Sequence, residues 1–592
     1  MCGIVGLINS QKDYDIDIIL KSLYHRGPDD FGYYKVNENS FLGQTRLSII
    51  DTSNHGHQPM VSKCGNYILV FNGEVYNHKE LKKELEAKGY IFESESDTEV
   101  ILNYYIDSED KDKFLNKLRG MFAFCIYDKK NESYFFARDR FGIKPLIYSY
   151  DGDSLCFSSE LKSLISSSLI SKKIDKDALN DYLQYGSIVQ PKTIYKDASY
   201  LMPSHYMVLD KNGLKITRYY SLMDNIKGLD VNYEEAVKIT RNKLEEATRY
   251  HMVSDVEVGA FLSGGIDSSA TVALMQKYSE KKIYTFCIGF KTGQSEVVDE
   301  LNIAKKTSDI LNTNHHEIVI DDKYINNIFD EYVSSMDQPS IDGLNTFIVS
   351  KEAATKVKVS ISGIGGDEIF AGYPHFEKFS KYPEDKNNIF KIALSSLNKL
   401  RPNRVTDRFQ YSGLSVEQRI DKLRTLDKIL YNNNKIIKNN LTKTKVQRIS
   451  LHEIDNYLLN TLLRDGDNFS MASSLEVRPV LLDHELVELA LSLSDNAKVG
   501  KKYLKEIFIE SVKDIIPEFV YKREKSGFVM PVVVWMNTIL NNRFKTLLDG
   551  NFKAILDEKY LKQLRCRVNN KEIIQKDWKV FMLLAWLKKN EI

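Results

Sequence analysis

The chain places a cysteine directly behind its initiator methionine, in the opening sequence Met-Cys-Gly-Ile-Val-Gly. Removal of Met1 would give Cys2 a free α-amine with a pKa of about 7.7 to 8.0, close to the ordinary thiol value of about 8.5. Such an amine can take the proton of its own thiol, so that nucleophile and base occupy one residue. The other interpretation is a cysteine that falls in a frayed terminus by chance. Alone, Cys2 only suggests a thiol nucleophile.

A second chemical signal is the loop Phe-Leu-Ser-Gly-Gly-Ile-Asp-Ser-Ser at residues 261–269. Gly264 and Gly265 let backbone amides approach an anion, and the N-terminus of a following helix adds positive potential. No lysine follows the glycines, as it would in a Walker A loop. Asp267 stands in the loop instead, where it could hold Mg²⁺ against a pyrophosphate. The alternative is an ordinary glycine turn capped by Ser and Asp.

A related loop, Ser-Gly-Ile-Gly-Gly-Asp-Glu at residues 362–368, follows the apolar run 357–361. Ligands of parallel sheets bind where the carboxyl ends of the strands converge. We therefore expect Asp367 and Asp267 to lie close enough to share metal ions.

Two kinds of element must position these residues. Up to about residue 205 the sequence predicts short strands at 67–71, 121–127 and 133–137, with helices at 78–88 and 97–105. After a polar stretch at 221–232, helix and strand alternate: helix 233–252, strand 256–262, helix 268–278, then strands at 283–290 and 357–361. Alternation of this kind indicates a parallel sheet. Beyond Gly372 the patterns are almost wholly helical.

Length and charge limit the class of protein. A chain of 592 residues exceeds a single hydrophobic core, so two or more domains are expected. The 82 Lys and Arg nearly balance the 81 Asp and Glu without a long basic block, which favours small-molecule substrates over nucleic acid or membrane. The six cysteines form no Cys-x-x-Cys pair, and neither a membrane span nor a signal peptide is evident, so a cytoplasmic location is expected.

Further motifs fall into two ordered series. The first is CGIVG, HRGPDD, RLSIID, NGEVYN, SDTEV and RDRFGIKPL, and the second is SGGIDSS, TFCIGF, SGIGGDE with FAGY, SMASSLEVRPVLLDH and KREKSGF. Together they resemble the glutamine-dependent asparagine synthetases from end to end. The resemblance implies an αββα sandwich of the N-terminal-nucleophile hydrolase type over residues 1–210. Over residues 211–592 it implies a parallel-sheet α/β nucleotide-binding domain with a largely helical C-terminal part.

For the first domain the resemblance implies a glutaminase in which Cys2 forms a thioester and releases ammonia. The Asn72 side chain and the Gly73 N–H would stabilise the oxyanion, and Arg46 would hold the α-carboxylate of glutamine. The implied glutamine-binding set is Arg46, Leu47, Ser48, Ile49, Ile50, Asn72, Gly73, Glu74 and Asp97, with Glu74 and Asp97 receiving the α-ammonium group. Each has a plainer interpretation: Asn72-Gly73 is a hairpin-turn signal, Arg46 a surface residue and Asp97 a helix cap.

For the second domain the resemblance implies cleavage of ATP to AMP and pyrophosphate, adenylation of a carboxylate and attack by ammonia. Its cofactors would be ATP and Mg²⁺, with the metal at Asp267 and Asp367. Lys525 would face the reacting acyl phosphate. The implied ATP-binding residues are Leu262, Ser263, Gly264, Gly265, Asp267, Ser268, Ile288, Ser362 and Gly363. The resemblance also suggests a homodimer and an ammonia tunnel lined by apolar and small residues between the domains.

The chain departs from the family where the acceptor would bind. Ile364 replaces a commonly acidic residue, and Asp465-Gly-Asp-Asn468 stands where Lys-Val-Asp-Arg is usual. Aspartate is the first acceptor hypothesis, and another carboxylate, such as a uronic acid of a surface polysaccharide, is the second. A regulatory protein without turnover is the third, and intact Cys2, Asp267, Asp367 and Lys525 argue against it.

Overall fold

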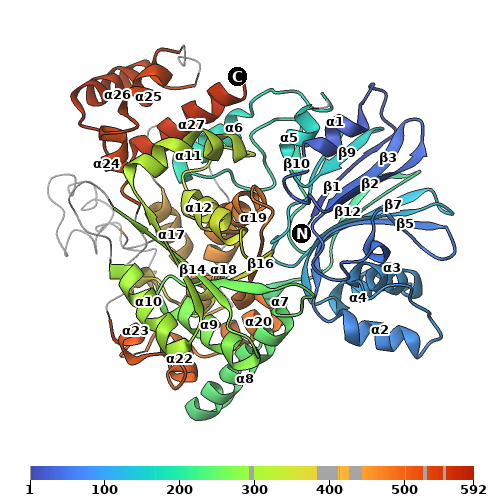
Figure 1. The fold of residues 1–592 in the computed structure, drawn as a ribbon, viewed down its shortest axis with the longest axis horizontal. Coiled ribbons are helices and arrows are strands. Elements are labelled where there is room, and N and C mark those ends of the chain that lie inside the picture. The colour runs from blue at the N-terminus through green and yellow to red at the C-terminus, as the bar shows by residue number, and fades with distance from the viewer. Residues whose placement is uncertain are drawn as a thin grey trace.

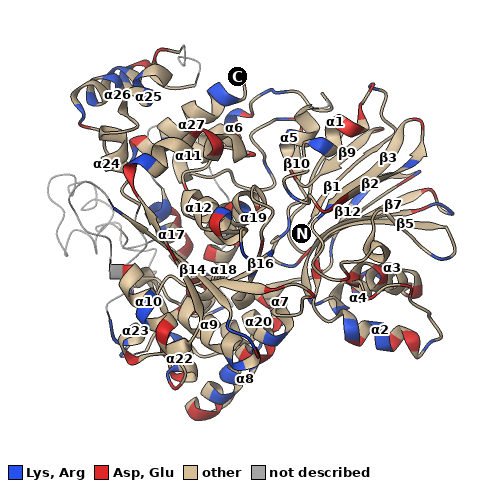
Figure 2. Cartoon of the chain, in the orientation of Figure 1, with Lys and Arg blue, Asp and Glu red and all other residues tan. Residues whose placement is uncertain are grey.

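The computed structural model describes residues 2–166, 168–291, 299–382, 411, 414–425, 443–500, 502–523, 530–550 and 555–592. A sheet-rich N-terminal part, blue to cyan in Figure 1, lies beside a larger part that contains helices around a parallel sheet. Lys and Arg, blue in Figure 2, and Asp and Glu, red, are interspersed along the chain in both parts. No helix within the described ranges is long and apolar enough to cross a membrane.

The N-terminal part contains two antiparallel sheets of six strands each. In spatial order the first sheet consists of β10 (Ser199–Tyr200), β8 (Ile147–Tyr150), β9 (Leu155–Ser158), β1 (Cys2–Ile8), β3 (Ser40–Arg46) and β2 (Asp30–Asn37). The second consists of β12 (Gly213–Arg218), β11 (His205–Asp210), β7 (Ser133–Arg138), β6 (Gly120–Asp128), β5 (Tyr67–Val75) and β4 (Met60–Val61).

Both faces of each sheet are covered, which explains why the central strands are almost continuously apolar. In β6, Ala123 and Cys125 pack into the core between the sheets, while Phe122 and Phe124 face a helical layer. The first sheet packs against α1 (Ile16–Lys21), α5 (Leu161–Ser166) and α6 (Lys176–Tyr185). The second packs against α2 (His78–Glu86), α3 (Asp97–Asp107) and α4 (Lys111–Lys117). The predicted αββα sandwich is confirmed.

The second part is built around a five-stranded parallel sheet. Its order is β15 (Asn314–Ile320), β14 (Tyr284–Phe290), β13 (Val258–Phe261), β16 (Val359–Ser362) and β17 (Glu476–Pro479). The helices among these strands are α8 (Tyr233–His251), α9 (Ile266–Tyr278), α10 (Asp299–Leu311), α11 (Asp322–Ser335) and α12 (Leu344–Ala353), and α7 (Leu222–Asn225) precedes them. Because β13 and β16 are parallel neighbours, the loops that follow them meet at one edge of the sheet.

The C-terminal part is largely helical, as predicted. Between β16 and β17 lie α13 (Gly366–Ile369), α14 (Pro374–Lys381), α17 (Val416–Arg424), α18 (Lys445–Glu453), a π-helical segment (Ile454–Leu463) and α19 (Arg464–Met471). After β17 follow α20 (His484–Ser492), α21 (Asp495–Lys498), α22 (Glu506–Val512), α23 (Glu518–Lys522), α24 (Val532–Asn537), α25 (Asn541–Leu548), α26 (Glu558–Asn570) and α27 (Asp577–Lys589). Short 3₁₀ turns are Asn54–Gly56 and Val480–Leu482. Among the described residues after Gly372, β17 is the one strand, and the sequence patterns did not indicate it.

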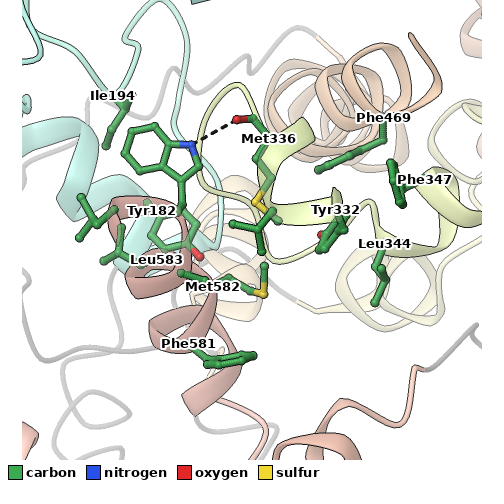
Figure 3. Packing of buried hydrophobic residues seen from close by; sticks show 14 of the residues in the cluster. Tyr182, Ile194, Tyr332, Met336, Leu344, Phe347, Phe469, Phe581, Met582 and Leu583 are labelled. Atoms are coloured by element: carbon green, nitrogen blue, oxygen red, sulfur yellow. Dashed lines mark hydrogen bonds between the residues drawn. The ribbon is translucent and has the colours of Figure 1, made fainter. Parts of the chain in front are cut away.

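One apolar cluster runs through both parts of the molecule. Figure 3 shows Tyr182 of α6 and Phe581 of α27 in one cluster with Tyr332 of α11 and Phe469 of α19. The indole Nε1 of Trp586 in α27 donates to the Met336 carbonyl at 3.3 Å. Since α27 is apolar over most of its circumference, it is buried between neighbours rather than laid on a surface.

Two expectations need correction. The predicted boundary after residue 210 separates β11 from β12, although these strands pair along their whole length. Residue 210 is therefore a poor boundary, and the two-domain division itself stays a prediction. The Asn72-Gly73 turn interpretation is also wrong, because β5 continues through both residues to Val75, paired with β6.

Candidate active sites

Cys2 opens β1 in the interior of the protein. It lies in register with Arg46 of β3, and only 7% of its surface is exposed. Burial raises the pKa of the Cys2 thiol. The Cys2 backbone nitrogen donates to Asn72 Oδ1 at 3.0 Å. A buried thiol of raised pKa needs a base close by before it can act as a nucleophile.

Asn72 and Gly73 lie together on β5 beside Cys2. While Asn72 Oδ1 accepts from Cys2, its Nδ2 is buried without a hydrogen-bond partner among the described residues. Such an unpaired buried donor is rare and costly in a folded protein. Gly73 has φ +152°, and a Cβ there would collide with the Met121 carbonyl oxygen. Glycine is thus required at 73, next to the unpaired Asn72 side-chain donor.

Two of the predicted ammonium-binding residues, Glu74 and Asp97, belong to a buried group of carboxylates. Glu74 Oε1 lies 3.5 Å from the Arg478 guanidinium, and Arg478 also pairs with Glu476 at 2.5 Å. Burial, and then the charge of Glu476, raise the pKa of Glu74 well above its usual value. Burial also raises the pKa of Asp97, which accepts from the Val75 N–H at 2.9 Å. The carboxylates of Glu74, Asp97 and Glu476 outnumber the single guanidinium of Arg478. A further cation bound beside them would therefore be stabilised by their charge.

Arg46 is held by the segment that follows it. Its guanidinium donates to the carbonyls of Ile50, Asp51 and Ser53 at 3.3, 2.5 and 3.2 Å. The Leu47, Ile49 and Ile50 side chains form a buried apolar cluster with Val359 of β16. The Ser48 N–H donates to Asp29 at 2.7 Å. The structure therefore brings Arg46 to Cys2 but turns the apolar side chains of the segment toward the parallel-sheet part.

Arg26 connects Cys2 to the second part, and the sequence assigned it no role. Its guanidinium is fully buried and donates to the Cys2 carbonyl at 3.1 Å, to Glu160 at 2.8 Å and to Asp467 of α19 at 2.8 Å. Arg26 belongs to the HRGPDD motif, but its partners lie 134 and 441 residues away in the sequence. The motif could single out Arg26 in the sequence, but it could not show that Glu160 and Asp467 are its partners.

A cavity of about 20 Å³ lies at this interface, room for about one water-sized molecule. Its walls combine apolar and polar surface, and the polar residues among them include Arg26, Glu160, Gln190, Asp337, Arg464 and Asp467. Arg464 faces this cavity, while its neighbour Asp465 lines the larger pocket of the second part. The ammonia tunnel itself stays a prediction.

The glycine loops after β13 and β16 border a pocket of about 380 Å³. Seven predicted nucleotide or metal residues line it: Ser263, Asp267, Ser268, Ile288, Ser362, Gly363 and Asp367. The two loops touch, because a Cβ on Gly366 would lie 2.8 Å from Asp267 Oδ1. The expected convergence of the two loops at one edge of the sheet is thus present.

Other predicted residues do not line the pocket. The Leu262 side chain is fully buried in the core, and its N–H donates to the Phe286 carbonyl at 2.9 Å. Gly264 has φ +71°, and a Cβ there would lie 2.9 Å from Ile303. Gly265 is the N-cap of α9. Lys525 lies outside the described residues.

Asp267 and Asp367 meet at a lysine that the sequence did not single out. Lys505 Nζ lies 2.7 and 2.5 Å from the two carboxylate oxygens of Asp267 and 2.6 Å from Asp367 Oδ1. The described residues contain no group of three or more metal-ligating side chains. Two carboxylates completed by phosphate oxygens are nevertheless a usual Mg²⁺ donor set. The pair therefore fits the metal, and its oxygens are gathered around a cationic side chain.

The pocket lining includes two further carboxylates, Asp342 and Glu368. Burial raises the pKa of Asp342 to about 6 and that of Glu368 to about 7. The Tyr373 hydroxyl donates to Glu368 Oε1 at 2.6 Å. Ile364 lies in the same lining, so the pocket is acidic even without a carboxylate at that position.

The sandwich with an internal Cys2 and the parallel sheet with paired glycine loops define an ATP-dependent glutamine amidotransferase of the ligase class. A family model for the glutamine amidotransferase domain matches residues 1–220, and a model for asparagine synthase matches residues 240–588. The chain belongs to the family of glutamine-hydrolysing asparagine synthetases.

Individual relatives match nearly the whole chain. Asparagine synthetase [glutamine-hydrolyzing] 1 of Bacillus subtilis is 31% identical, over 99% of this chain and 96% of the relative. Asparagine synthetase [glutamine-hydrolyzing] 3 of the same organism is 30% identical, over 92% and 91%. A protein named Amidase chry2, from Gibberella zeae, is 26% identical over 92% and 91%. The chain is thus similar to differently named proteins along most of their length.

Proposed function

We propose that the protein makes asparagine from aspartate, glutamine, ATP and water, and releases AMP, pyrophosphate and glutamate. The supporting observation is that one chain carries both the buried Cys2–Asn72 pair and the 380 Å³ pocket beneath two glycine loops. Glutamine hydrolysis at the first centre supplies ammonia, and the second centre consumes it.

In the glutaminase reaction the α-amine of Cys2, freed by removal of Met1, takes the thiol proton. The thiolate attacks the side-chain amide carbon of glutamine, and the unpaired Asn72 Nδ2 donates to the developing oxyanion together with the Gly73 N–H. Collapse of the tetrahedral species breaks the C–N bond, and the departing nitrogen leaves as ammonia with the proton held by the amine. Water then hydrolyses the thioester to glutamate.

Glutamine is oriented by charge at its other end. Arg46 provides a planar set of donors for the α-carboxylate. The α-ammonium group completes the buried carboxylate group of Glu74 and Asp97, whose raised pKa values reflect an environment short of positive charge.

In the synthetase reaction a carboxylate oxygen of the acceptor attacks the α-phosphate of ATP, and pyrophosphate leaves. Ammonia then attacks the acyl carbon of the adenylate, and AMP departs. Asp267 and Asp367 would hold Mg²⁺, which would supply positive charge to neutralise the phosphates. The role of Lys525 stays a prediction.

Confinement of ammonia between the centres would avoid dilution and protonation in bulk water. The interface cavity lies between Arg26, which contacts Cys2, and α19, whose Asp465 lines the nucleotide pocket. We propose that ammonia passes on this side of α19.

A second candidate is the same amidotransfer onto another carboxylate. Ile364 in the pocket lining, in place of a commonly acidic residue, is the observation that favours it.

Release of AMP and pyrophosphate with ammonium as nitrogen source separates these candidates. Release that depends on aspartate, with asparagine as product, supports the proposal. If AMP and pyrophosphate are released only with a uronic acid, the acceptor is a uronic acid and not aspartate. No release with any carboxylate, from protein that still hydrolyses glutamine, would contradict ligase turnover.

A further inference from the structure

Lys505 occupies the position between Asp267 and Asp367 at which a cation would bind. Its ammonium group lies within 2.7 Å of three carboxylate oxygens, two from Asp267 and one from Asp367. The lysine is 4% exposed, while the two carboxylate side chains are each 21% exposed. The ion pairs are therefore shielded on the lysine side and reachable from the pocket.

The surrounding backbone is shaped to admit this side chain. Lys505 has φ +58° and ψ 32°, a left-handed conformation that residues other than glycine seldom adopt. A Cβ on Gly372 would collide with Lys505 Cε and with Asp367 Oδ1. Both the unusual dihedral angles and the missing side chain at 372 serve to bring the ammonium group between the carboxylates.

A lysine and a divalent cation cannot share this position. Three carboxylate oxygens already surround Nζ at hydrogen-bond distance, so a metal held by the same two carboxylates would compete with Lys505 for their lone pairs and would be repelled by its positive charge. Without Lys505, two carboxylates on touching loops would repel each other. The ammonium group thus performs the charge compensation that a metal would otherwise supply.

We propose that Lys505 is the resident counter-ion of the Asp267–Asp367 pair, and that it makes divalent metal binding depend on the nucleotide. In the nucleotide-free protein Lys505 holds the two loops together and excludes the metal. Phosphate oxygens offer the ammonium group an alternative partner, so the metal enters only together with a phosphate ligand. Lys505 is a positioning residue, and this role rests on the proposed metal function of the two aspartates.

The test is Mn²⁺ binding to the full-length protein, followed by the electron paramagnetic resonance signal of free Mn²⁺. Without nucleotide, the wild type should bind Mn²⁺ at least about tenfold more weakly than Lys505→Met, because the variant removes the cationic group that lies between the two carboxylates. Added pyrophosphate should raise wild-type affinity and change that of Lys505→Met much less. Asp267→Asn in the Lys505→Met background should abolish the gained site.

Lys513→Met is the matched control, since Lys513 is an exposed lysine that follows α22 and pairs with Glu510. It should bind Mn²⁺ as the wild type does. Glutamine hydrolysis reports whether each variant is folded, and the wild-type comparison with and without pyrophosphate remains valid if Lys505→Met does not fold.

Wild-type binding that equals that of folded Lys505→Met without nucleotide would overturn the proposal, as would wild-type binding unaffected by pyrophosphate. Aspartate-dependent AMP release by the wild type is measured separately. A wrong acceptor therefore changes that assay and leaves the Mn²⁺ comparison intact.

Discussion

At the scale of single residues, Cys2 has the most direct test. Cys2→Ala removes the thiol, so glutamine-dependent product formation should fall by about a thousandfold or more. Synthesis from added ammonium salt should remain near the wild-type rate, because the second centre does not use the thiol. Product analysis with each nitrogen source measures both, and glutamine-driven product from the variant would exclude Cys2 as the nucleophile.

Asn72 tests the oxyanion contact. Asn72→Ala deletes the buried Nδ2 donor, and the loss of one such donor typically lowers kcat by about 10²- to 10³-fold. Steady-state glutaminase kinetics should show this fall with a much smaller change in KM. A changed KM with an unchanged kcat would assign Asn72 to substrate binding instead.

Glu368 should make stability depend on pH. Its pKa in the folded protein is raised to about 7 from 4.5, so its protonated form stabilises the fold below about pH 4.5, and this contribution is lost as the pH rises through about 7. Glu368→Gln cannot ionise. At pH 8.5 the variant should therefore be more stable than the wild type by up to about 3 kcal/mol, and at pH 5 the two should be nearly equal.

Thermal unfolding at the two pH values measures this difference. Glu377→Gln, at an exposed position of α14, is the control and should show no pH-dependent gain. If Glu368→Gln changes the unfolding temperature equally at pH 5 and pH 8.5, the charge of the Glu368 carboxyl group does not change between these pH values in the folded protein. The group would then be neutral at both, or stabilised as an anion at both.

At the scale of elements, β17 deserves a test because it serves both centres. Val477 lines the nucleotide pocket, while its neighbours Glu476 and Arg478 face the carboxylate group around Glu74. Arg478→Met would leave buried carboxylates uncompensated, at a cost of about 3 to 5 kcal/mol. The variant should unfold at lower temperature and show a raised KM for glutamine.

Arg249→Met, on an exposed position of α8, is the matched control and should stay within about 0.5 kcal/mol of the wild type. A lowered unfolding temperature with an unchanged KM would limit Arg478 to a structural role.

The elements also show what the sequence could predict. Local patterns gave helix α3, whose Ser96 cap accepts from the Glu99 N–H as the Ser-Asp-Thr-Glu pattern indicated. They gave strands β6, β7 and β14 within a few residues. They missed β17, because its four residues are flanked by helices and its alternation of charged and apolar residues is too short to recognise.

The sites were predictable to a similar limit. Motifs located Cys2, Asn72 and the two glycine loops, because each lies in a short stretch that can be recognised without knowing the fold. Lys505 could not be found, because its role follows from contacts with Asp367 and with Asp267, which is 238 residues away. The Leu47 and Ile49 side chains were assigned to glutamine, yet they pack on β16, a contact that depends on how the two parts meet.

At the scale of the whole molecule, α27 should couple the stability of both parts. Trp586 is fully buried and lies 6.0 Å, between ring centroids, from Tyr195 of the N-terminal part. Trp586→Ala should cost about 3 to 5 kcal/mol. Because the cluster is shared, glutaminase activity and ammonia-dependent synthesis should be lost over the same temperature range.

Lys588→Ala, on the exposed side of α27, is the control and should leave both activities unchanged. Glutaminase activity that survives heating well beyond the loss of synthesis would show that the sandwich does not depend on this cluster.

The packing of Leu47, Ile49 and Ile50 on Val359 links sequence changes in the two parts of the molecule. The stretch directly follows Arg46, which pairs with Cys2, whereas its apolar side chains pack against the parallel-sheet part. A substitution in this stretch therefore affects both the surroundings of Cys2 and the packing against β16. Chimaeras that combine the sandwich of this protein with the remaining portion of a distant homologue should work only when both faces of that contact are transplanted together.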